Sequence, residues 1–389
     1  MDEVTRRVIS IYVLALEPSG DILGARLIDA LRDQASESVS FSGVGGTAMK
    51  AAGLDSLFDP SDLAILGIFE VLPKARTVLR RVRDVLADIE RVHPDVLVTI
   101  DSWGFTGRVH KALAKKNSTV KRVRYVAPQV WAWRPGRAKQ LSRWIDHLLT
   151  LFPFEPPLFE RHGLAVTWVG HPVTESVFGG SSARFRSENS LDADAQVLTV
   201  LPGSRKSEIH TLMPVFGQAI AQLADRLPEI SVAIPTVAHV EAEVRAWAET
   251  LPIAAHVVVG SEARDDAFAA SSAALSASGT VTLELARAEL PHVIAYKVNP
   301  FSAFVFRRLA KTRYVNLINV LLGEEVVPEC LQERCTAEVL SEVVYSLMES
   351  EPQRRKQLYA FHSALAQLSP GEVAPSDGAA EIILELSKN

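Results

Sequence analysis

A loop in the middle of the chain combines a glycine turn with cationic side chains and the expected start of a helix. The apolar run 197–201 is typical of a buried strand, and it breaks just before Gly203. Ser204 and Arg205 follow, and a helix is expected to begin near Glu208. Glycine lets the backbone approach a ligand, and both an arginine fork and a helix N-terminus favour phosphate. This loop therefore predicts an anion site; the alternative is an ordinary loop with a surface arginine.

A second candidate for binding an anion follows another short apolar strand, 273–276. Ser278, Gly279 and Thr280 are expected at a helix N-terminus, where free N–H groups and the helix dipole favour phosphate. Glu284 lies about one helical turn after Thr280 on the same face, where a carboxylate can accept hydrogen bonds from ribose hydroxyls. The alternative for these residues is a helix cap and a surface glutamate.

Two further loops place polar side chains directly after a buried strand. Asp101 follows the run 96–100, at the end of the strand where ligands of α/β proteins bind, and we interpret it as a general base. The alternative is a cap for the next helix. In the first loop of the chain, Glu17 and Ser19 are expected to approach a ligand, and Asp21 is expected to cap the helix that follows.

Aromatic and basic side chains alternate in the segment 125–137. Trp131 and Trp133 lie two residues apart, beside Arg134 and Arg137. Stacking on a sugar and contact with an anionic headgroup are both compatible with this pattern. Packing of at least one tryptophan in the core is the alternative, because this side chain buries a large area.

These loops are positioned by a regular alternation of strands and helices, which predicts parallel, doubly wound sheets. We expect an α/β protein with two Rossmann-like halves that face each other across a cleft at the carboxyl ends of both sheets. The predicted domains are 1–178, 179–345 and a helical segment 346–389, with a polar linker at 178–195. The expected strands are 8–16, 41–44, 96–100, 122–126 and 147–151 in the first half, and 197–201, 230–234, 256–259, 273–276 and 292–295 in the second.

The composition is that of a soluble globular protein and excludes several classes. The 389 residues are 48% hydrophobic with a net charge of −5, so there is no basic field for nucleic acid. Cys330 and Cys335 are interpreted as reduced thiols of a cytosolic protein. The glycine-rich stretch 43–46 lacks dinucleotide-binding spacing, and 192–194 (Asp-Ala-Asp) is interpreted as a turn, so neither a cofactor nor a metal is expected. No apolar run reaches about 18 residues, so no membrane-spanning helix is expected.

The segment 63–86 joins a dense apolar patch to a basic helix. Apolar residues beside clustered arginines favour a helix that lies in a membrane interface and is attracted to anionic lipid. A core helix with a solvated basic face is the alternative. The apolar residues are Ile65, Leu66, Ile68, Phe69, Val71 and Leu72, and the arginines are Arg76, Arg80, Arg81 and Arg83.

Taken in order, the motifs give the chain a strong resemblance, over nearly its whole length, to the lipid-A-disaccharide synthases, glycosyltransferases of the GT-B fold. The number of motifs in the right order makes the resemblance specific. Leu16 and Ile318 depart from the family, which usually has glycine and proline at those positions. The motifs are 17–21, 43–46, 126–137 with Trp131-Ala-Trp133, 152–155, 170–172, 201–208, 277–280 with Glu284, and 314–332.

The resemblance implies a function in lipid A biosynthesis. The family joins UDP-2,3-diacylglucosamine to 2,3-diacylglucosamine 1-phosphate, which forms a β(1→6) disaccharide and releases UDP. Asp101 matches the family's essential aspartate, and Arg205 matches its phosphate-side arginine. Glu284 matches its nucleotide-binding glutamate, and Asn319 matches an asparagine near the nucleotide. Ser204 and the residues 278–280 are expected to bind the same ligand.

The resemblance also implies partners and a location. The segment Ile65–Arg83 matches a membrane-docking surface that receives acyl chains, so a peripheral protein on the cytoplasmic face of the inner membrane is expected. Family members can pair through exchanged C-terminal segments, so a homodimer is expected, with C-terminal helices that pack back or swap between subunits. Two alternatives belong to other classes: a UDP-sugar 2-epimerase of the same fold, and a non-catalytic membrane-associated nucleotide-binding protein.

Overall fold

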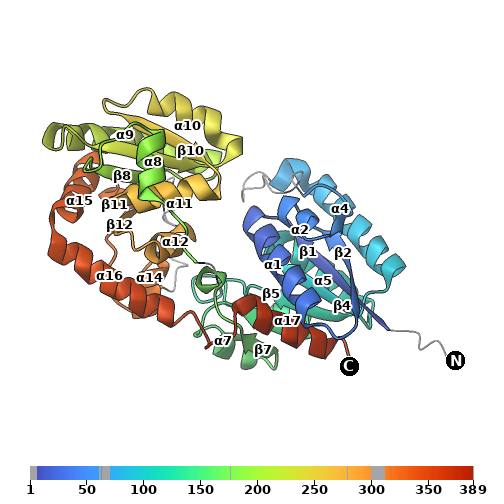
Figure 1. Ribbon diagram of the computed structural model, residues 1–389. Helices are drawn as coiled ribbons and strands as arrows, with labels where there is room; N and C mark the ends of the chain where they lie inside the picture. Colours follow the sequence, from blue (N-terminus) through green and yellow to red (C-terminus); the bar gives the residue numbers. More distant parts are fainter. Residues whose placement is uncertain are drawn as a thin grey trace. The chain divides into compact units, whose positions relative to one another are not determined.

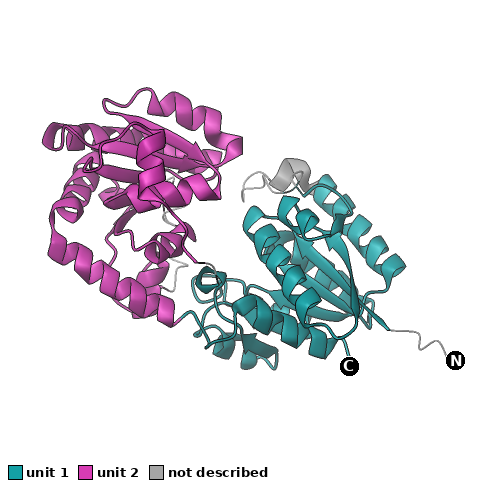
Figure 2. Cartoon of the chain, in the orientation of Figure 1, with its two compact units in different colours: residues 1–175, 368–389 teal, residues 176–367 magenta. Residues whose placement is uncertain are grey.

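The chain folds into two compact units, which are described separately. Unit 1 comprises residues 1–175 and 368–389, and unit 2 comprises residues 176–367 (Figure 2). The computed structural model describes residues 7–60, 63, 71–175, 177–277, 279–298 and 312–388. The chain thus passes from unit 1 into unit 2 close to the expected division between 178 and 179.

Unit 1 is built on a parallel sheet. Within the described residues its strand order is β3-β2-β1-β4-β5-β6-β7, and every neighbouring pair runs parallel. The central strands are almost continuous apolar runs because helices cover both faces of the sheet (Figure 1). The strands are β1 (Val8–Ala15), β2 (Ser38–Val44), β3 (Asp55–Ser56), β4 (Val96–Ile100), β5 (Lys121–Tyr125), β6 (His147–Thr150) and β7 (Ala165–Trp168).

The two faces of this sheet bury different helices. Tyr12 and Leu97 point into a core cluster that α4 and α5 complete. Ile100 points to the opposite face, where α1 lies so close that a Cβ on Gly20 or Gly24 would meet its side chain at 3.3 or 3.2 Å. The helices of unit 1 are α1 (Pro18–Gln34), α2 (Thr47–Ala51), α4 (Val71–Val92), α5 (Trp103–Lys115), α6 (Gly136–Leu141), α7 (Pro156–Glu160), the short 3₁₀ turn η1 (Pro172–Thr174) and α17 (Pro375–Leu386).

Asp21 caps a helix, but not the one that the sequence suggested. The cap position of α1 belongs to Glu17, and Asp21 lies inside the first turn. Its buried carboxylate instead accepts the backbone N–H groups of Gly46, Ala48 and Met49 at 2.7, 2.8 and 3.1 Å, at the start of α2. The expectation was wrong because the nearest unsatisfied donors lie on a helix about 25 residues away, which only the folded chain brings into reach.

The C-terminal segment does not form the separate helical unit expected at 346–389. The helix α17 belongs to unit 1, where it packs along α1 and buries Ala379 and Ile383. Gln34 on α1 donates to the backbone carbonyl of Asp377 at 3.1 Å. The preceding helix α16 (Glu351–Ala366) belongs to unit 2. The segment divides because each helix buries its apolar stripe against a different sheet domain.

Unit 2 is also a parallel α/β sheet, so the expected class of two such domains is confirmed. Over the part of the chain that is described, its strand order is β10-β9-β8-β11-β12-β13. The strands are β8 (Val197–Leu201), β9 (Ser231–Thr236), β10 (Ala255–Val259), β11 (Ala273–Ala277), β12 (His292–Tyr296) and β13 (Glu329–Leu331). The helices are α8 (Ser182–Glu188), α9 (Lys206–Arg226), α10 (Glu241–Ala248), α11 (Ser261–Ala270), α12 (Val281–Arg287), α14 (Leu317–Leu322), α15 (Ala337–Glu349) and α16.

The polar stretch 178–195 is more than the linker that its composition suggested. It contains α8, whose Phe185 is buried in a cluster with Val197 and Ala267. Arg184 on the same helix forms an ion pair with Asp266 on α11. The burial of Phe185 anchors this short helix. A single aromatic residue among polar ones is too weak a pattern for the composition to predict a helix.

Candidate functional site

Asp101 occupies the carboxyl end of β4, in a backbone conformation that few residues adopt. Asp101 and Ser102 both have φ of +47°, and the N–H of Asp101 donates to the carbonyl of Tyr125 on β5 at 3.2 Å. The cap position of α5 belongs to Ser102, so the capping alternative for Asp101 is wrong. The Asp101 side chain remains 47% exposed at the edge of the sheet where ligands of α/β proteins bind.

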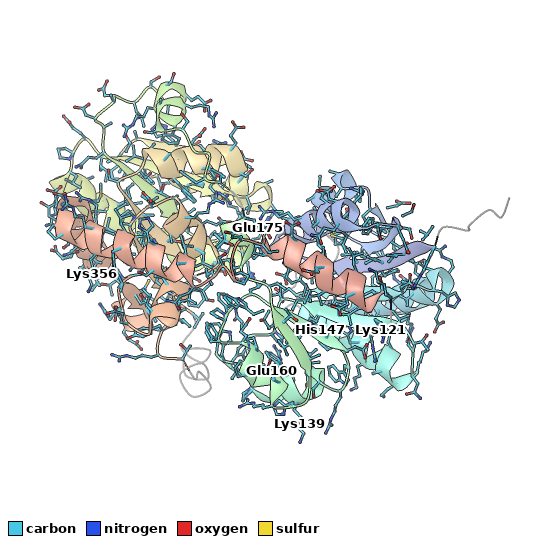
Figure 3. All side chains as sticks on the ribbon, turned by 60° about the horizontal axis from the view of Figure 1, so that its bottom comes forward. Lys121, Lys139, His147, Glu160, Glu175 and Lys356 are labelled. Carbon is cyan, nitrogen blue, oxygen red and sulfur yellow. The ribbon has the colours of Figure 1, made fainter. Side chains whose placement is uncertain are left out.

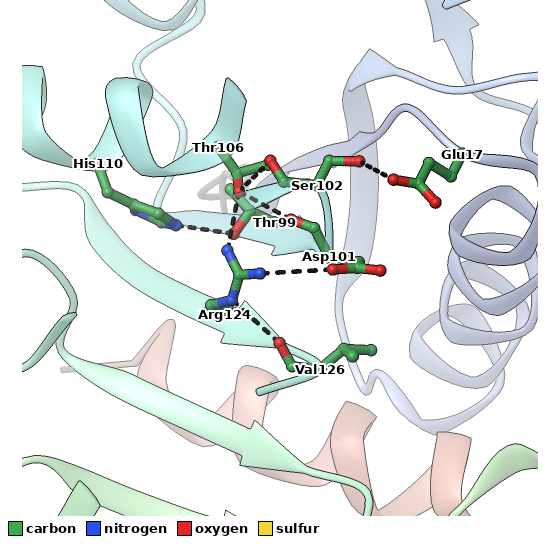
Figure 4. A network of polar contacts seen from close by, with 8 residues as sticks. All are labelled: Glu17, Thr99, Asp101, Ser102, Thr106, His110, Arg124 and Val126. Carbon is green, nitrogen blue, oxygen red and sulfur yellow. Dashed lines mark hydrogen bonds and ion pairs between the residues drawn. The ribbon is translucent and has the colours of Figure 1, made fainter. Parts of the chain in front are cut away.

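A buried arginine holds this turn in place (Figure 4). Arg124 on β5 is fully buried, and its Nη2 lies 3.7 Å from Oδ1 of Asp101. Its Nη1 donates to Oγ1 of Thr106 at 2.8 Å, and its Nε donates to the carbonyl of Val126 at 3.0 Å. The Thr106 hydroxyl in turn donates to the Asp101 carbonyl at 2.8 Å. The network therefore holds the backbone of Asp101 by a hydrogen bond and its carboxylate by an ion pair.

Arg124 stays a cation in this network. Burial lowers its pKa to about 10, and the Asp101 carboxylate opposes that shift. A charge this deeply buried needs an opposite charge nearby, and Asp101 provides it. Arg124 was not among the predicted site residues. In the run Lys121–Tyr125, two arginines alternate with apolar residues as on an ordinary half-exposed strand.

Glu17 reaches the same turn from the first loop. The Ser102 hydroxyl donates to Oε1 of Glu17 at 3.3 Å (Figure 4). Glu17 therefore contacts the residue that follows Asp101 in the turn. Ser19, the second residue of α1, is exposed. Leu16 is buried in the core cluster with Phe58, so its bulk points away from the loop and not toward a ligand.

His110 lies close to Asp101 but cannot take its place as a base. It is fully buried on α5, and its Nε2 lies 2.7 Å from Oγ1 of Thr99. Burial, reinforced by the charge of Arg124, holds its pKa well below the usual range, so the imidazole is neutral at physiological pH. A side chain without access to solvent cannot exchange a proton with a bound hydroxyl.

In unit 2 the loop after β8 surrounds an anionic group, and that group belongs to the protein itself. The N–H groups of Ser204 and Arg205 donate to Oε2 of Glu208 at 3.2 and 3.3 Å. Nη1 of Arg205 donates to Oε1 of the same carboxylate at 2.9 Å. Gly203 has φ of +118°, and a Cβ there would lie 2.8 Å from Glu208. The loop therefore converges its donors on one point and has room there only for glycine.

The second loop of unit 2 leaves the sheet beside the first. Strands β8 and β11 are neighbours in register, with Leu201 opposite Ser276. Gly279 and Thr280 are exposed between β11 and α12, and Ser278 lies outside the described residues. Glu284 on α12 forms an ion pair with Arg264 on α11 at 2.9 Å. Burial raises the pKa of Glu284, and Arg264 offsets part of that rise.

Asn319 is buried and holds a loop. Its Nδ2 donates to the carbonyl of Val327 at 2.8 Å and to Oε1 of Glu329 at 2.9 Å. Its Oδ1 accepts the N–H groups of Val326 and Val327 at 2.9 and 3.0 Å. These four bonds use the whole capacity of the amide, so a direct contact with a nucleotide would have to replace one of them.

Ile318, the second departure from the family pattern, has a role of its own. Its N–H donates to Oδ1 of Asn316 at 2.8 Å, which caps α14. Proline cannot make this bond because it has no N–H. The Glu329 carboxylate, which sequence analysis did not single out, accepts the N–H groups of Val315 and Asn316 at 3.0 Å each. The N-terminal end of α14 is therefore held by two side chains, those of Asn316 and Glu329.

The described part of α4 is amphipathic. Val78, Val82 and Val85 are buried in the core of unit 1, whereas Arg76, Arg80 and Arg83 are exposed. Arg81 lies over the ring of Phe58 at 4.4 Å. The apolar patch from Ile65 to Glu70, and the side chains of 71–75, lie outside what the structure describes. None of the described helices is long and apolar enough to cross a bilayer.

Within the described residues, neither the cysteines nor the potential metal ligands form a second candidate site. Cys330 and Cys335 are both free and buried, and burial raises the pKa of Cys330 to about 11, so it is an unreactive thiol. Across the described residues, no group of three His, Cys, Asp or Glu side chains could hold a metal ion.

Comparison with known proteins identifies the family. A family model described as lipid-A-disaccharide synthetase matches residues 11–383. The lipid-A-disaccharide synthase of Paramagnetospirillum magneticum is 47% identical over 378 residues, which is 96% of this chain and 97% of that protein. The synthase of Rhodospirillum centenum is 45% identical and covers 97% of this chain and 94% of its own length.

Solved structures support the fold. The UDP-GlcNAc 2-epimerase from Neisseria meningitidis bound to UDP-GlcNAc has a TM-score of 0.62 at 12% identity, covering 98% of this chain and 100% of that chain. MurG from Acinetobacter baumannii has a TM-score of 0.54 at 15% identity, covering 98% and 99%. At such low identities these structures support the fold alone. The epimerase alternative is not favoured, because the relatives that are 40–47% identical are named lipid-A-disaccharide synthases. The chain therefore belongs to the lipid-A-disaccharide synthetase family, glycosyltransferases of lipid A biosynthesis with the GT-B fold.

Proposed function

We propose that the protein transfers the sugar of UDP-2,3-diacylglucosamine to the 6-hydroxyl of 2,3-diacylglucosamine 1-phosphate, which gives a β(1→6) disaccharide and UDP. The observation that carries the proposal is the Asp101 carboxylate, half-exposed at the end of β4 and 3.7 Å from the buried guanidinium of Arg124. A carboxylate that reaches solvent from a backbone held by hydrogen bonds meets the geometric requirement of a general base. Family membership supports the choice of substrates.

In the proposed reaction Asp101 takes the proton of the acceptor's 6-hydroxyl. The oxygen forms a bond to the anomeric carbon of the donor while the bond from that carbon to UDP breaks on the opposite face, so the configuration inverts. Arg205, the N–H groups of Ser204 and Arg205, and the loop 278–280 meet the charge that develops on the diphosphate. The carboxylate of Glu284 accepts hydrogen bonds from the ribose hydroxyls. In this scheme Asn319 acts by holding the segment around α14 and not by touching the nucleotide.

The experiment that tests the function is an assay of UDP release with purified lipid substrates. UDP is expected to appear only when donor and acylated acceptor are both present. UDP and an epimerised sugar released from the donor alone would indicate a 2-epimerase. A non-catalytic nucleotide-binding protein would release no UDP, and its thermal shift with UDP would not exceed the shift with GDP or NADH.

We further propose that the protein docks on the cytoplasmic face of the inner membrane through the segment Ile65–Arg83. The exposed Arg76, Arg80 and Arg83 on one side of α4 support attraction to anionic lipid, at about 1 kcal/mol for each basic residue near the surface. Leu79 is 49% exposed on the same helix and would add apolar contact. A homodimer that exchanges C-terminal segments is also proposed, and α17 is the element that would exchange.

The docking surface can be tested by substitution. Serine at Phe69, Leu72 and Leu79 is expected to move the protein from the membrane pellet to the supernatant after cell lysis, because the apolar part of the attraction is lost. Fractionation followed by immunoblotting measures the change.

A matched control places serine at Val237, Val259 and Tyr359, which are exposed apolar residues of unit 2. This variant is expected to pellet as the wild-type protein does. If the two triple variants behave alike, the segment Ile65–Arg83 is not the docking surface.

A further inference from the structure

A stack of alternating arginine and tryptophan side chains leads from the Asp101 turn to the surface of unit 1. The Cζ atom of Arg124 lies 5.5 Å from the ring centroid of Trp103. Arg137 lies between two indole rings. Its Cζ atom is 4.9 Å from the ring centroid of Trp103 and 5.0 Å from the ring centroid of Trp133. Arg134, which is exposed, lies 4.4 Å from the Trp133 ring. The buried end of the stack is the arginine that fixes the candidate base.

The outer two cations of this stack have no acidic partner among the residues that the structure describes. Neither Arg134 nor Arg137 forms an ion pair with a carboxylate there, whereas about half of the other described arginines of unit 1 do. Burial and the charge of Arg134 both lower the pKa of Arg137. Two guanidinium groups that share one indole and lack a counter-ion repel each other, and an anion between them would remove that repulsion.

The backbone around the stack is held in unusual conformations. Arg134 has φ of +51°, and Val126, at the end of β5, has φ of +76°. A β-branched residue at positive φ is a marked outlier, and such conformations gather where a protein must present side chains in a fixed direction. With Asp101 and Ser102 at φ of +47°, four strained positions lie on the two loops that follow β4 and β5. The direction of the arginines is thus imposed by the fold.

We propose that Arg134 and Arg137 bind the phosphate group of the acceptor sugar; this inference rests on the proposed function. Trp103 follows Asp101 by only two residues and stacks on Arg137, so a cation lies within one side chain of the base. The carbons that bear the phosphate and the 6-hydroxymethyl group of the acceptor flank the ring oxygen of one pyranose, so the proposal requires the phosphate site and the base to lie in the same part of unit 1. Planar guanidinium forks bind phosphate in a bidentate manner, and the indoles keep the planes of the forks fixed.

The test compares two acceptors that differ only in the phosphate: 2,3-diacylglucosamine 1-phosphate and the corresponding methyl glycoside. The double variant Arg134→Ala and Arg137→Ala is expected to lose about 10²-fold in kcat/KM with the phosphorylated acceptor, since each charged hydrogen bond contributes roughly 10-fold or more. It is expected to keep wild-type kcat/KM with the methyl glycoside and an unchanged KM for the donor. The variant Arg134→Lys and Arg137→Lys keeps the charges but loses the planar guanidinium groups. Its kcat/KM with the phosphorylated acceptor is expected to lie between the values of the wild type and of the double alanine variant.

Lys139→Gln is the matched control, because this exposed lysine follows Arg137 by two residues on α6 and its substitution removes one positive charge (Figure 3). It is expected to leave both acceptors unaffected. Equal losses of the double variant on both acceptors would overturn the proposal, because they would indicate a packing role for the stack. Weaker pelleting with phosphatidylglycerol vesicles, combined with an unchanged acceptor preference, would also overturn it, because the anion would then be a membrane headgroup.

The same assay separates this proposal from the one on which it rests. If the wild-type protein releases no UDP with either acceptor, the proposed function fails and the assigned ligand fails with it. If the wild-type protein is active but shows no preference for the phosphorylated acceptor, only the phosphate site is wrong.

Discussion

Asp101→Asn is expected to lower kcat by about 10³- to 10⁴-fold, at the upper end of what a general base contributes. The substitution keeps the shape of the side chain but leaves no group that can take the proton of the 6-hydroxyl. Asparagine also tolerates a φ of +47°, so the backbone of the turn should survive the change, whereas the buried Arg124 loses its counter-charge and the variant is expected to lose some stability. Steady-state assay of UDP release with both lipid substrates measures the effect, and KM for the donor should stay close to the wild-type value.

Asp29→Asn is the control for this variant. Asp29 lies exposed on α1 of the same unit and pairs with Arg32 of its own helix, at 3.1 Å, so its loss should leave turnover unchanged. Near-normal turnover by Asp101→Asn would refute the assignment of the base. A thermal melt accompanies the assay, so that the stability lost with the counter-charge of Arg124 is separated from the loss of the base.

Arg205→Ala is expected to lower kcat by about 10²- to 10³-fold, the usual effect of removing one donor that stabilises charge in a transition state. The Arg205 side chain is 66% exposed and contacts Glu208 in the same loop, so its removal should not disturb the core of unit 2. The negative charge on the diphosphate is larger in the transition state than in the bound donor, and for that reason kcat should fall more than the affinity for the donor.

Lys206→Ala provides a close comparison because it removes the same charge from the next residue. Its side chain points elsewhere and pairs with Glu243 on α10 at 2.7 Å. We expect it to retain turnover within a few-fold of the wild type. Equal losses in the two variants would show that only the general positive field matters, and the specific role of the Arg205 fork would be wrong.

The sequence predicted the parts of the fold that depend on local patterns. The apolar runs of β4 and β8 are continuous because helices cover both faces, so Val96–Ile100 and Val197–Leu201 were found with their bounds. The three-residue β13 was not found, because such a short run has no periodicity of its own. The helix α17 was recognised as a helix but not as part of unit 1, because its partner α1 lies more than 300 residues earlier in the chain.

For the candidate site, residue types were easier to predict than their partners. Asp101 and Glu17 could be named because each directly follows a buried strand. Arg124 could not, because a buried arginine in a strand looks like an exposed one until the neighbouring elements are known. Glu208 looked like an ordinary acidic residue in the first turn of a helix, and only the folded loop shows that its carboxylate turns back onto Ser204 and Arg205.

The position of Glu208 has a consequence for the catalytic cycle. The donors of the loop already hold one anion, so any diphosphate that uses them enters by exchange, and the carboxylate swings out to solvent. The same side chain is then ready to return when the bond to the sugar has broken. Competition from this carboxylate lowers the affinity for the product UDP as much as the affinity for the UDP-sugar donor. It thereby favours the release of UDP after each turnover.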